Sequence, residues 1–127
     1  MNEQTLMNKY LRIFRQKDLS MKETAMCWRI ECGSGWYDLI DTLCYSLQRL
    51  TDKAGHPQVE FTQVKEKFGS LRIYTDGASD LQWGLISFAE DLSEKICEKC
   101  GKSGKLRNDG WIQTLCDDCQ KKREING

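Results

Sequence analysis

The chain has 127 residues, of which 39% are hydrophobic and 30% charged, and its formal net charge is zero. The length predicts one domain, or one small domain with an appendage. The hydrophobic content supports a core, and this content together with the single proline excludes a disordered chain.

No run of about 18 apolar residues is present, which excludes a membrane-spanning helix of the usual kind. The first residues, Met1–Thr5, lack the basic and apolar regions of an export signal. Seven cysteines without such a signal indicate reduced thiols and metal ligands rather than disulfides, and their odd number excludes complete pairing. We therefore expect a cytoplasmic protein.

Residues 3–17 are predicted to form an amphipathic helix, because large apolar side chains recur at helical spacing from Leu6 to Phe14. This helix is expected to pack on the core, and a partner or a second copy of the chain is the alternative. Residues 18–35 are less regular, and Ser20 with Glu23 could open a short capped helix.

Residues 36–54 give the clearest helical pattern, with one broad apolar face from Trp36 to Leu50. Gly55 and Pro57 are natural stop signals for this helix. Residues 58–75 then change to a period of two, which predicts two antiparallel strands with a turn near 65–69. Helical spacing returns over residues 80–96, with Ser79 as the expected cap, and this helix leads directly into Cys97.

The last third of the chain contains two Cys-x-x-Cys pairs, Cys97 with Cys100 and Cys116 with Cys119, separated by 15 residues. Four thiolates at this spacing can enclose one Zn²⁺ tetrahedrally. A site with four sulfur ligands has no open coordination position, so we expect a structural zinc ion and not a catalytic one.

The segment between the two pairs predicts a second hairpin, with turn residues at Asn108–Gly110, and residues 120–125 predict a short helix. Pair, hairpin, pair and helix in this order are typical of a treble-clef finger, and without the last helix a plain zinc ribbon remains. The predicted fold class is therefore α+β, with an α+β core over residues 1–96 and a continuous zinc finger over residues 97–127.

Few side chains suit catalysis. His56, the single histidine, precedes a proline in an expected loop, and no sequence motif of a hydrolase, a phosphate-binding loop or a histidine metal site is present. Cys44 lies on the apolar face of a predicted helix and is expected in the core. Cys27 and Cys32 could join His56 in a second metal site, but their spacing does not favour it. An enzyme remains a third hypothesis that would require His56 or Cys27 to meet a carboxylate in a pocket.

Two surfaces are candidates for binding. The first lies on the predicted hairpin, where Lys65, Lys67, Arg72 and Tyr74 could bind an anion, a nucleotide or a partner protein. The second lies on the finger. Its candidate residues are Lys105, Arg107, Trp111, Lys121, Lys122 and Arg123.

The charge distribution weakens the nucleic-acid interpretation of the second surface. Residues 95–127 carry eight basic and five acidic side chains, and four thiolates with Zn²⁺ would leave this segment near +1. Such a weak basic bias is not typical of an obligate nucleic-acid binder. The seam between hairpin and finger is the first place where we expect a ligand.

The chain resembles a family of small bacteriophage and prophage proteins. The resemblance rests on Gly35–Ile40, on Val64–Arg72, on Ile96–Gly101, and on Gly110-Trp111 with Leu115-Cys116, and it covers roughly residues 28–120. It implies a phage or mobile-element setting, in which small proteins often bind host machinery, and it transfers no catalytic residue.

We therefore expect a non-enzymatic, zinc-stabilised binding protein that binds or sequesters a host defence protein or a nucleotide signal. A nucleic-acid-binding zinc protein is the alternative. The sequence also allows a homo-oligomer.

Overall fold

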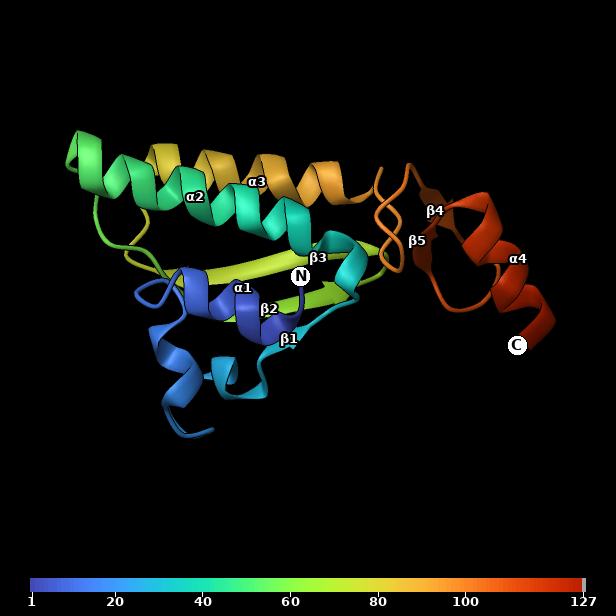
Figure 1. Cartoon of the computed structure of the whole chain (residues 1–127), viewed down its shortest axis with the longest axis horizontal. Helices are drawn as coiled ribbons and strands as arrows, with labels where there is room; N and C mark the ends of the chain where they lie inside the picture. The colour runs from blue at the N-terminus through green and yellow to red at the C-terminus, as the bar shows by residue number, and fades with distance from the viewer. Residues whose placement is uncertain (127) are drawn as a thin grey trace.

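The computed structural model describes residues 1–126, which form a three-stranded sheet covered by helices and followed by a small finger (Figure 1). The helices are α1 (Glu3–Lys9), α2 (Tyr37–Ala54), α3 (Asp80–Ser93) and α4 (Asp117–Asn126). The strands are β1 (Ile30–Glu31), β2 (Glu60–Lys67), β3 (Ser70–Asp76), β4 (Lys105–Arg107) and β5 (Gln113–Leu115). Short 3₁₀ helices are η1 (Arg15–Asp18), η2 (Ala25–Trp28) and η3 (Ser34–Trp36). The predicted α+β class is confirmed.

The N-terminal helix is shorter than predicted. It ends at Lys9, and Tyr10 already has non-helical backbone angles. The chain leaves the helix because Ile13 runs beside β2, where its carbonyl accepts the Phe61 N–H at 2.8 Å. Arg15 then forms a two-point ion pair with Glu60. Tertiary contacts with the sheet have therefore overridden the helical pattern.

The expected helix from Ser20 to Glu23 is also absent from the structure. These residues form a turn, in which the Glu23 N–H donates to the Ser20 carbonyl. The helical segment comes later, as η2, and it is capped by Thr24, whose hydroxyl accepts the Met26 N–H.

The clearest helix pattern is confirmed by α2. Its C-terminus is closed by Gly55, which has a left-handed φ of 74° and donates its N–H to the Leu50 carbonyl. The predicted cap of α3 is confirmed as a capping box, in which Ser79 and Gln82 each bond to the other's backbone N–H. This helix ends at Ser93, three residues before the predicted end at residue 96.

The predicted hairpin is confirmed by β2 and β3, with Lys65 opposite Arg72 and Val64 opposite Ile73. The sheet has a third strand, β1, which pairs in parallel with β2. The sequence did not indicate this strand, because it is only two residues long. The outer edge of β3 is covered by α3. Ser93 Oγ accepts the Leu71 N–H, and Glu90 Oε2 accepts the Ile73 N–H, both at 2.9 Å.

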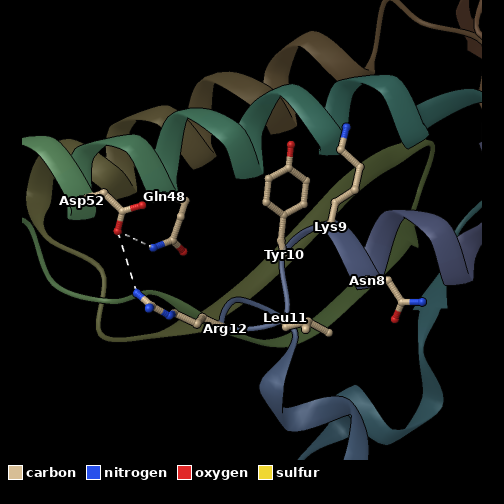
Figure 2. Close-up of a pocket in the computed structure, with 7 residues that line it drawn as sticks. All are labelled: Asn8, Lys9, Tyr10, Leu11, Arg12, Gln48 and Asp52. Atoms are coloured by element: carbon tan, nitrogen blue, oxygen red, sulfur yellow. Dashed lines mark hydrogen bonds and ion pairs between the residues drawn. The ribbon is translucent and has the colours of Figure 1, made fainter.

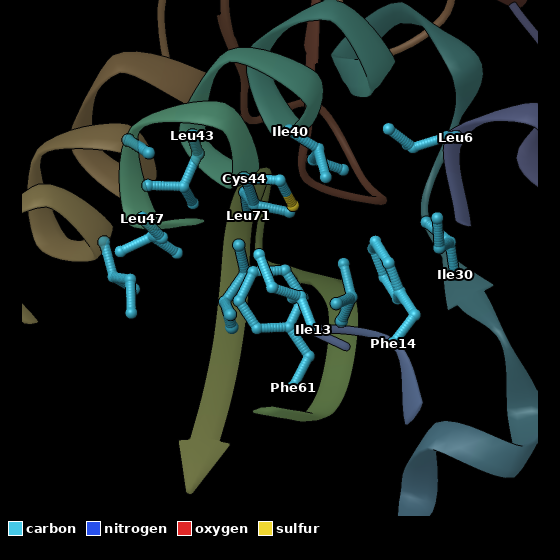
Figure 3. Close-up of a cluster of buried hydrophobic side chains, with 14 of the residues drawn as sticks. Leu6, Ile13, Phe14, Ile30, Ile40, Leu43, Cys44, Leu47, Phe61 and Leu71 are labelled. Carbon is cyan, nitrogen blue, oxygen red and sulfur yellow. The ribbon is translucent and has the colours of Figure 1, made fainter. Parts of the chain in front are cut away.

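The core lies between the sheet and the helices α1, α2 and α3, and Figure 3 shows part of it. Phe14 and Phe61 meet edge to face, with ring centroids 5.3 Å apart. Cys44 is fully buried among these side chains, as predicted. Among residues 1–126, no helix combines the length and apolar character that a membrane crossing requires.

The turn of the hairpin holds an aromatic residue in an unfavourable backbone conformation. Phe68 and Gly69 both have positive φ, 54° and 82°, which is the pattern of a type I′ turn. Asparagine tolerates this region far better than a bulky aromatic residue. The Phe68 ring is 67% exposed and therefore gains little from burial.

We therefore expect Phe68→Asn to raise the free energy of unfolding by roughly 0.5–1 kcal/mol, measured by urea denaturation. Phe68→Ala is the matched control and should give no such gain, because alanine also disfavours positive φ. A loss of stability in Phe68→Asn would show that the exposed ring makes contacts that outweigh the strain.

Candidate metal centre and candidate binding surfaces

The four paired cysteines meet in one cluster at the finger. Cys97 and Cys100 lie in the turn after α3, Cys116 directly follows β5, and Cys119 lies in the first turn of α4. Their Sγ atoms all lie within 4.8 Å of one another. The order of turn, hairpin and helix, with the second pair at the helix start, is that of a treble-clef finger. The sequence left a treble clef and a plain ribbon open, and the presence of α4 favours the treble clef.

Local backbone contacts shape the first cysteine turn. The Cys97 N–H donates to the Lys102 carbonyl at 2.7 Å, and the Gly101 N–H donates to the Cys97 carbonyl at 2.9 Å. Gly101 has a φ of 83°, which glycine adopts without strain. The Cys119 N–H points at Cys116 Sγ, at 3.4 Å. Such a bond orients a sulfur ligand and stabilises its charge.

The electrostatics of the cluster also fit a cation. Burial raises the pKa of the Cys97 thiol, but hydrogen bonds from the backbone at Cys116, Cys100 and Lys99 lower it overall, to about 7. Burial and the neighbouring thiols raise the pKa of Cys119 to about 12. Crowded thiols cannot all ionise alone, whereas a bound divalent cation deprotonates each ligand. Four sulfur donors within 4.8 Å of one another suit Zn²⁺, and these residues would hold it as a structural ion.

One residue between the zinc ligands, Glu98, joins the finger to the core. Its carbonyl accepts the Gly35 N–H at 2.7 Å, and its Oε2 accepts the Gly33 N–H at 2.9 Å. Its own N–H donates to the Thr114 carbonyl at 3.0 Å. Burial raises the pKa of the Glu98 carboxyl. Sequence reasoning missed this residue, although the glycine pair ahead of α2 was a signal for a close backbone approach.

Two further contacts fix the finger. The Trp36 indole N–H donates to the Ile96 carbonyl at 2.8 Å, and the Thr114 hydroxyl donates to the Gly69 carbonyl at 2.6 Å. Gly69 packs so closely on the finger that an added Cβ would lie 2.4 Å from a methyl carbon of Leu106. The seam between hairpin and finger, where we expected a ligand, is therefore filled by protein atoms.

The first candidate surface is assembled on one face of the sheet. Lys65 lies directly opposite Arg72, and Tyr74 lies two residues farther along β3, on the same side. Lys67 lies on this side as well, and all four point away from Val64, Leu71 and Ile73, which are buried in the core. We call Lys65, Lys67, Arg72 and Tyr74 the open sheet face. Within residues 1–126 its three basic side chains form no ion pair.

The second candidate surface, on the finger, is only partly available. Arg107 donates to the Leu115 carbonyl and pairs with Asp117 at 2.8 Å. Arg123 likewise donates to the Trp111 carbonyl and to Gln113. Lys105 is exposed, and the Trp111 side chain is 74% exposed. A shallow hollow beside the cysteines is lined by Lys99, Cys119, Lys122, Arg123 and Asn126.

The groups considered for catalysis or a second metal site lie apart. His56 Nδ1 bonds to Ser79 Oγ at 2.9 Å, and Cys27 Sγ donates to the Thr24 carbonyl. Burial and the nearby Glu98 carboxylate raise the pKa of Cys32, which favours the thiol form. In the described part of the chain, only the four-cysteine cluster brings three or more such groups within metal-binding distance. The second metal site is therefore not formed.

A polar depression lies between the end of α1 and α2 (Figure 2), lined by Asn8, Lys9, Tyr10, Leu11, Arg12, Gln48 and Asp52. Its polar side chains form hydrogen bonds or ion pairs with one another or with residues of α2. The Tyr10 hydroxyl donates to Asp41 at 2.6 Å, and Asp52 accepts from Gln48 and lies 3.9 Å from Arg12. Burial raises the pKa of Tyr10. These polar side chains thus serve the contact between the end of α1 and α2.

Comparisons of the chain with protein-family models, with curated proteins and with solved structures found no match.

The cluster predicts about one zinc ion per chain by elemental analysis. Cys97→Ser should lower this content strongly, and chelation should speed hydrogen exchange across residues 97–126, because the ligands hold the finger together. Cys27→Ser is the matched control, since this thiol lies outside the cluster, and it should leave the metal content unchanged. A full zinc content in Cys97→Ser would refute the ligand assignment.

The close contact between Glu98 and the loop before α2 can be tested by adding a side chain at Gly35. A Cβ at Gly35 would lie 2.2 Å from the Cys97 carbonyl oxygen and 2.5 Å from that of Glu98. We expect Gly35→Ala to lower the free energy of unfolding by about 1–3 kcal/mol and to weaken zinc binding, because the two backbones must separate. The exposed neighbour variant Ser34→Ala should change neither quantity by more than about 0.5 kcal/mol. Unchanged zinc affinity in Gly35→Ala would show that the finger folds independently.

Proposed function

We propose that the protein is a non-enzymatic binding protein, stabilised by one structural zinc ion, that recognises an anionic ligand on its open sheet face. The observation that carries this proposal is the state of Arg72. Its Nε is buried without a hydrogen-bond partner, and the side chain forms no ion pair within residues 1–126.

An unpartnered Nε–H is costly, because a buried donor has lost water without gaining another acceptor. The Glu90 carboxylate is close enough for Arg72 to lower its pKa, but it forms no ion pair with Arg72 within residues 1–126. A phosphate or carboxylate would supply that acceptor in the planar geometry that arginine favours. Lys65, directly across the sheet, would add a second positive charge, and Tyr74 would offer a ring to a nucleobase. Glu31, beside Lys65 on β1, would repel an anion that binds near that edge of the sheet.

Among host components, this chemistry favours a nucleotide signal over a defence protein. A nucleotide carries both a phosphate for Arg72 and Lys65 and a ring for Tyr74, which is 46% exposed. The resemblance to phage proteins supports a role as an accessory factor of a phage or mobile element that sequesters such a signal. The separation of His56, Cys27 and Cys32 supports a binding role over an enzymatic one.

A nucleic-acid-binding role is the second candidate, and one observation favours it. The exposed Trp111 ring lies on the finger, which also carries the hollow lined by Lys99, Lys122 and Arg123. An exposed indole and a basic groove are the elements of a single-strand binding surface. Such binding would weaken steeply with salt, and flat titrations at low salt would exclude it.

Calorimetry of the zinc-loaded protein with ATP, a cyclic dinucleotide and pyrophosphate tests the open sheet face. We expect at least one nucleotide to bind, and Arg72→Gln to weaken it by about tenfold or more, the effect of about 1.4 kcal/mol. Tyr74→Ala should weaken the nucleotides but leave pyrophosphate unchanged.

Lys22→Gln is the control for charge alone, because Lys22 is exposed and remote from the sheet face in sequence. No heat with any of the three probes, or equal loss in Arg72→Gln and Lys22→Gln, would overturn the proposal.

A further inference from the structure

A β-bulge interrupts β2 beside the open sheet face. Phe61 pairs with Thr75. The next pair along the two strands joins Gln63 to Tyr74, so Thr62 is an extra residue on β2. Bulges of this kind re-aim side chains and are frequent next to functional sites. Here the bulge sets Gln63 directly across from Tyr74, the aromatic residue of the open sheet face.

Gln63 extends the open sheet face toward β1. It lies two residues before Lys65 on β2, so both side chains are on the same side of the sheet. Directly opposite residues of an antiparallel pair have Cβ atoms about 5 Å apart. A ring that stacks on Tyr74 would therefore present one of its edges to the Gln63 amide.

Glu31 on β1 supplies a second polar group to this side of the face. Its register partner is Lys65, but its carboxylate forms no ion pair within residues 1–126. It accepts a long hydrogen bond from Gln63, whose Nε2 lies 3.5 Å from Glu31 Oε1. A bond of this length between exposed side chains contributes little to folding, so it leaves both groups available to a ligand.

The direction of this contact decides which atom of the amide a ligand would meet. With Nε2 turned toward Glu31, the Gln63 Oε1 is turned away from it. The amide oxygen and the carboxylate both accept hydrogen bonds, whereas Arg72, on the far strand β3, offers donors only. The open sheet face thus has a donor side on β3, for a phosphate, and an acceptor side toward β1.

Nucleobases differ in what they offer to two acceptors. Adenine and cytosine carry an exocyclic amino group, which donates, whereas hypoxanthine and uracil carry an oxygen at the same position. The amino group can donate to either acceptor, but a base oxygen would face both without a proton to share. Gln63 could donate to such an oxygen only by turning its Nε2 away from Glu31.

We propose that Gln63 and Glu31 are specificity-determining residues of the open sheet face, which select nucleotides of adenine or cytosine by the amino group of the base. The inference rests on the proposed function, because it needs a phosphate on Arg72 and a base on Tyr74. Glu31 then has two effects. Its charge keeps phosphates on the Arg72 side, and its carboxylate accepts from the amino group. The same charge that repels an anion thus fixes the orientation of a nucleotide.

Calorimetry of the zinc-loaded protein with two matched pairs of ligands tests this selection. ATP and ITP differ in an amino group or an oxygen at one position of the purine, and CTP and UTP differ in the same way on the pyrimidine. We expect the amino member of each pair to bind about tenfold more tightly, because the other member leaves the acceptors without a donor. Pyrophosphate, which has no base, reports the phosphate contacts alone.

Variants of the two acceptors assign the selection to them. Gln63→Leu should reduce the preference for ATP over ITP to about twofold or less and leave the affinity for pyrophosphate unchanged. Glu31→Gln should reduce the same preference and also strengthen pyrophosphate binding, because it removes a repulsive charge. Gln4→Leu is the matched control, since Gln4 is exposed on α1, on the core side of the sheet, and it should change none of these affinities. Circular dichroism and zinc content would verify that each variant is folded.

Equal affinities within each pair, a preference for ITP or UTP, or a preference that persists in Gln63→Leu would each overturn this inference. If pyrophosphate still binds in those cases, the proposed anion site on Arg72 would stand. No heat with any of the five probes would instead refute the proposed function, and this inference with it.

Discussion

The three backbone and side-chain hydrogen bonds of Glu98 are the constraint on which the arrangement of the whole protein depends. The residue lies between two zinc ligands, and it bonds at the same time to the loop before α2 and to β5. Its position cannot shift without moving Cys97, Gly35 or Thr114. We therefore expect folding of the finger to be coupled to its docking on the core, so that the free energy of zinc binding would contribute to both.

This coupling gives the zinc site its role. Four sulfur ligands close the coordination sphere, so the ion has no position for a substrate. A bound ion would therefore act on function indirectly. It would fix β5, from which the Thr114 hydroxyl donates to the Gly69 carbonyl and holds the hairpin tip at one end of the sheet. The open sheet face is thus supported by the core from behind and by the finger at the tip. A rigid face of this kind loses little entropy when it binds a ligand.

Local patterns predicted the parts of the fold whose stability is local. The apolar face of α2, the alternation in β2 and β3, the Ser79 cap and the cysteine spacing each follow from a few neighbouring residues. The pattern over residues 3–17 was wrong from Tyr10 onward, because Ile13 pairs with β2 and Arg15 pairs with Glu60, both distant in sequence. The same reason hides β1, a strand of two residues that exists only because β2 lies beside it.

In the candidate sites, too, local patterns predicted some residues, and the roles of others depend on distant contacts. The four ligands were predictable from spacing, whereas the role of Glu98 depends on three partners up to 65 residues away. The four residues of the open sheet face were predictable as a group, because alternation places them on one side of a hairpin. Arg107 could not be assigned in this way. Its sequence context is basic, but its guanidinium is occupied by the Leu115 carbonyl and Asp117.

The two faces of the helix–sheet layer differ in a way that bears on how the protein would work. Within residues 1–126, the basic side chains of the open sheet face form no ion pair, and large apolar side chains of α3 are exposed on the helical side. The hydrophobic core lies between these two faces. An anion on the open sheet face would therefore be held by a surface that the core supports from behind, and it would leave the helical side uncovered.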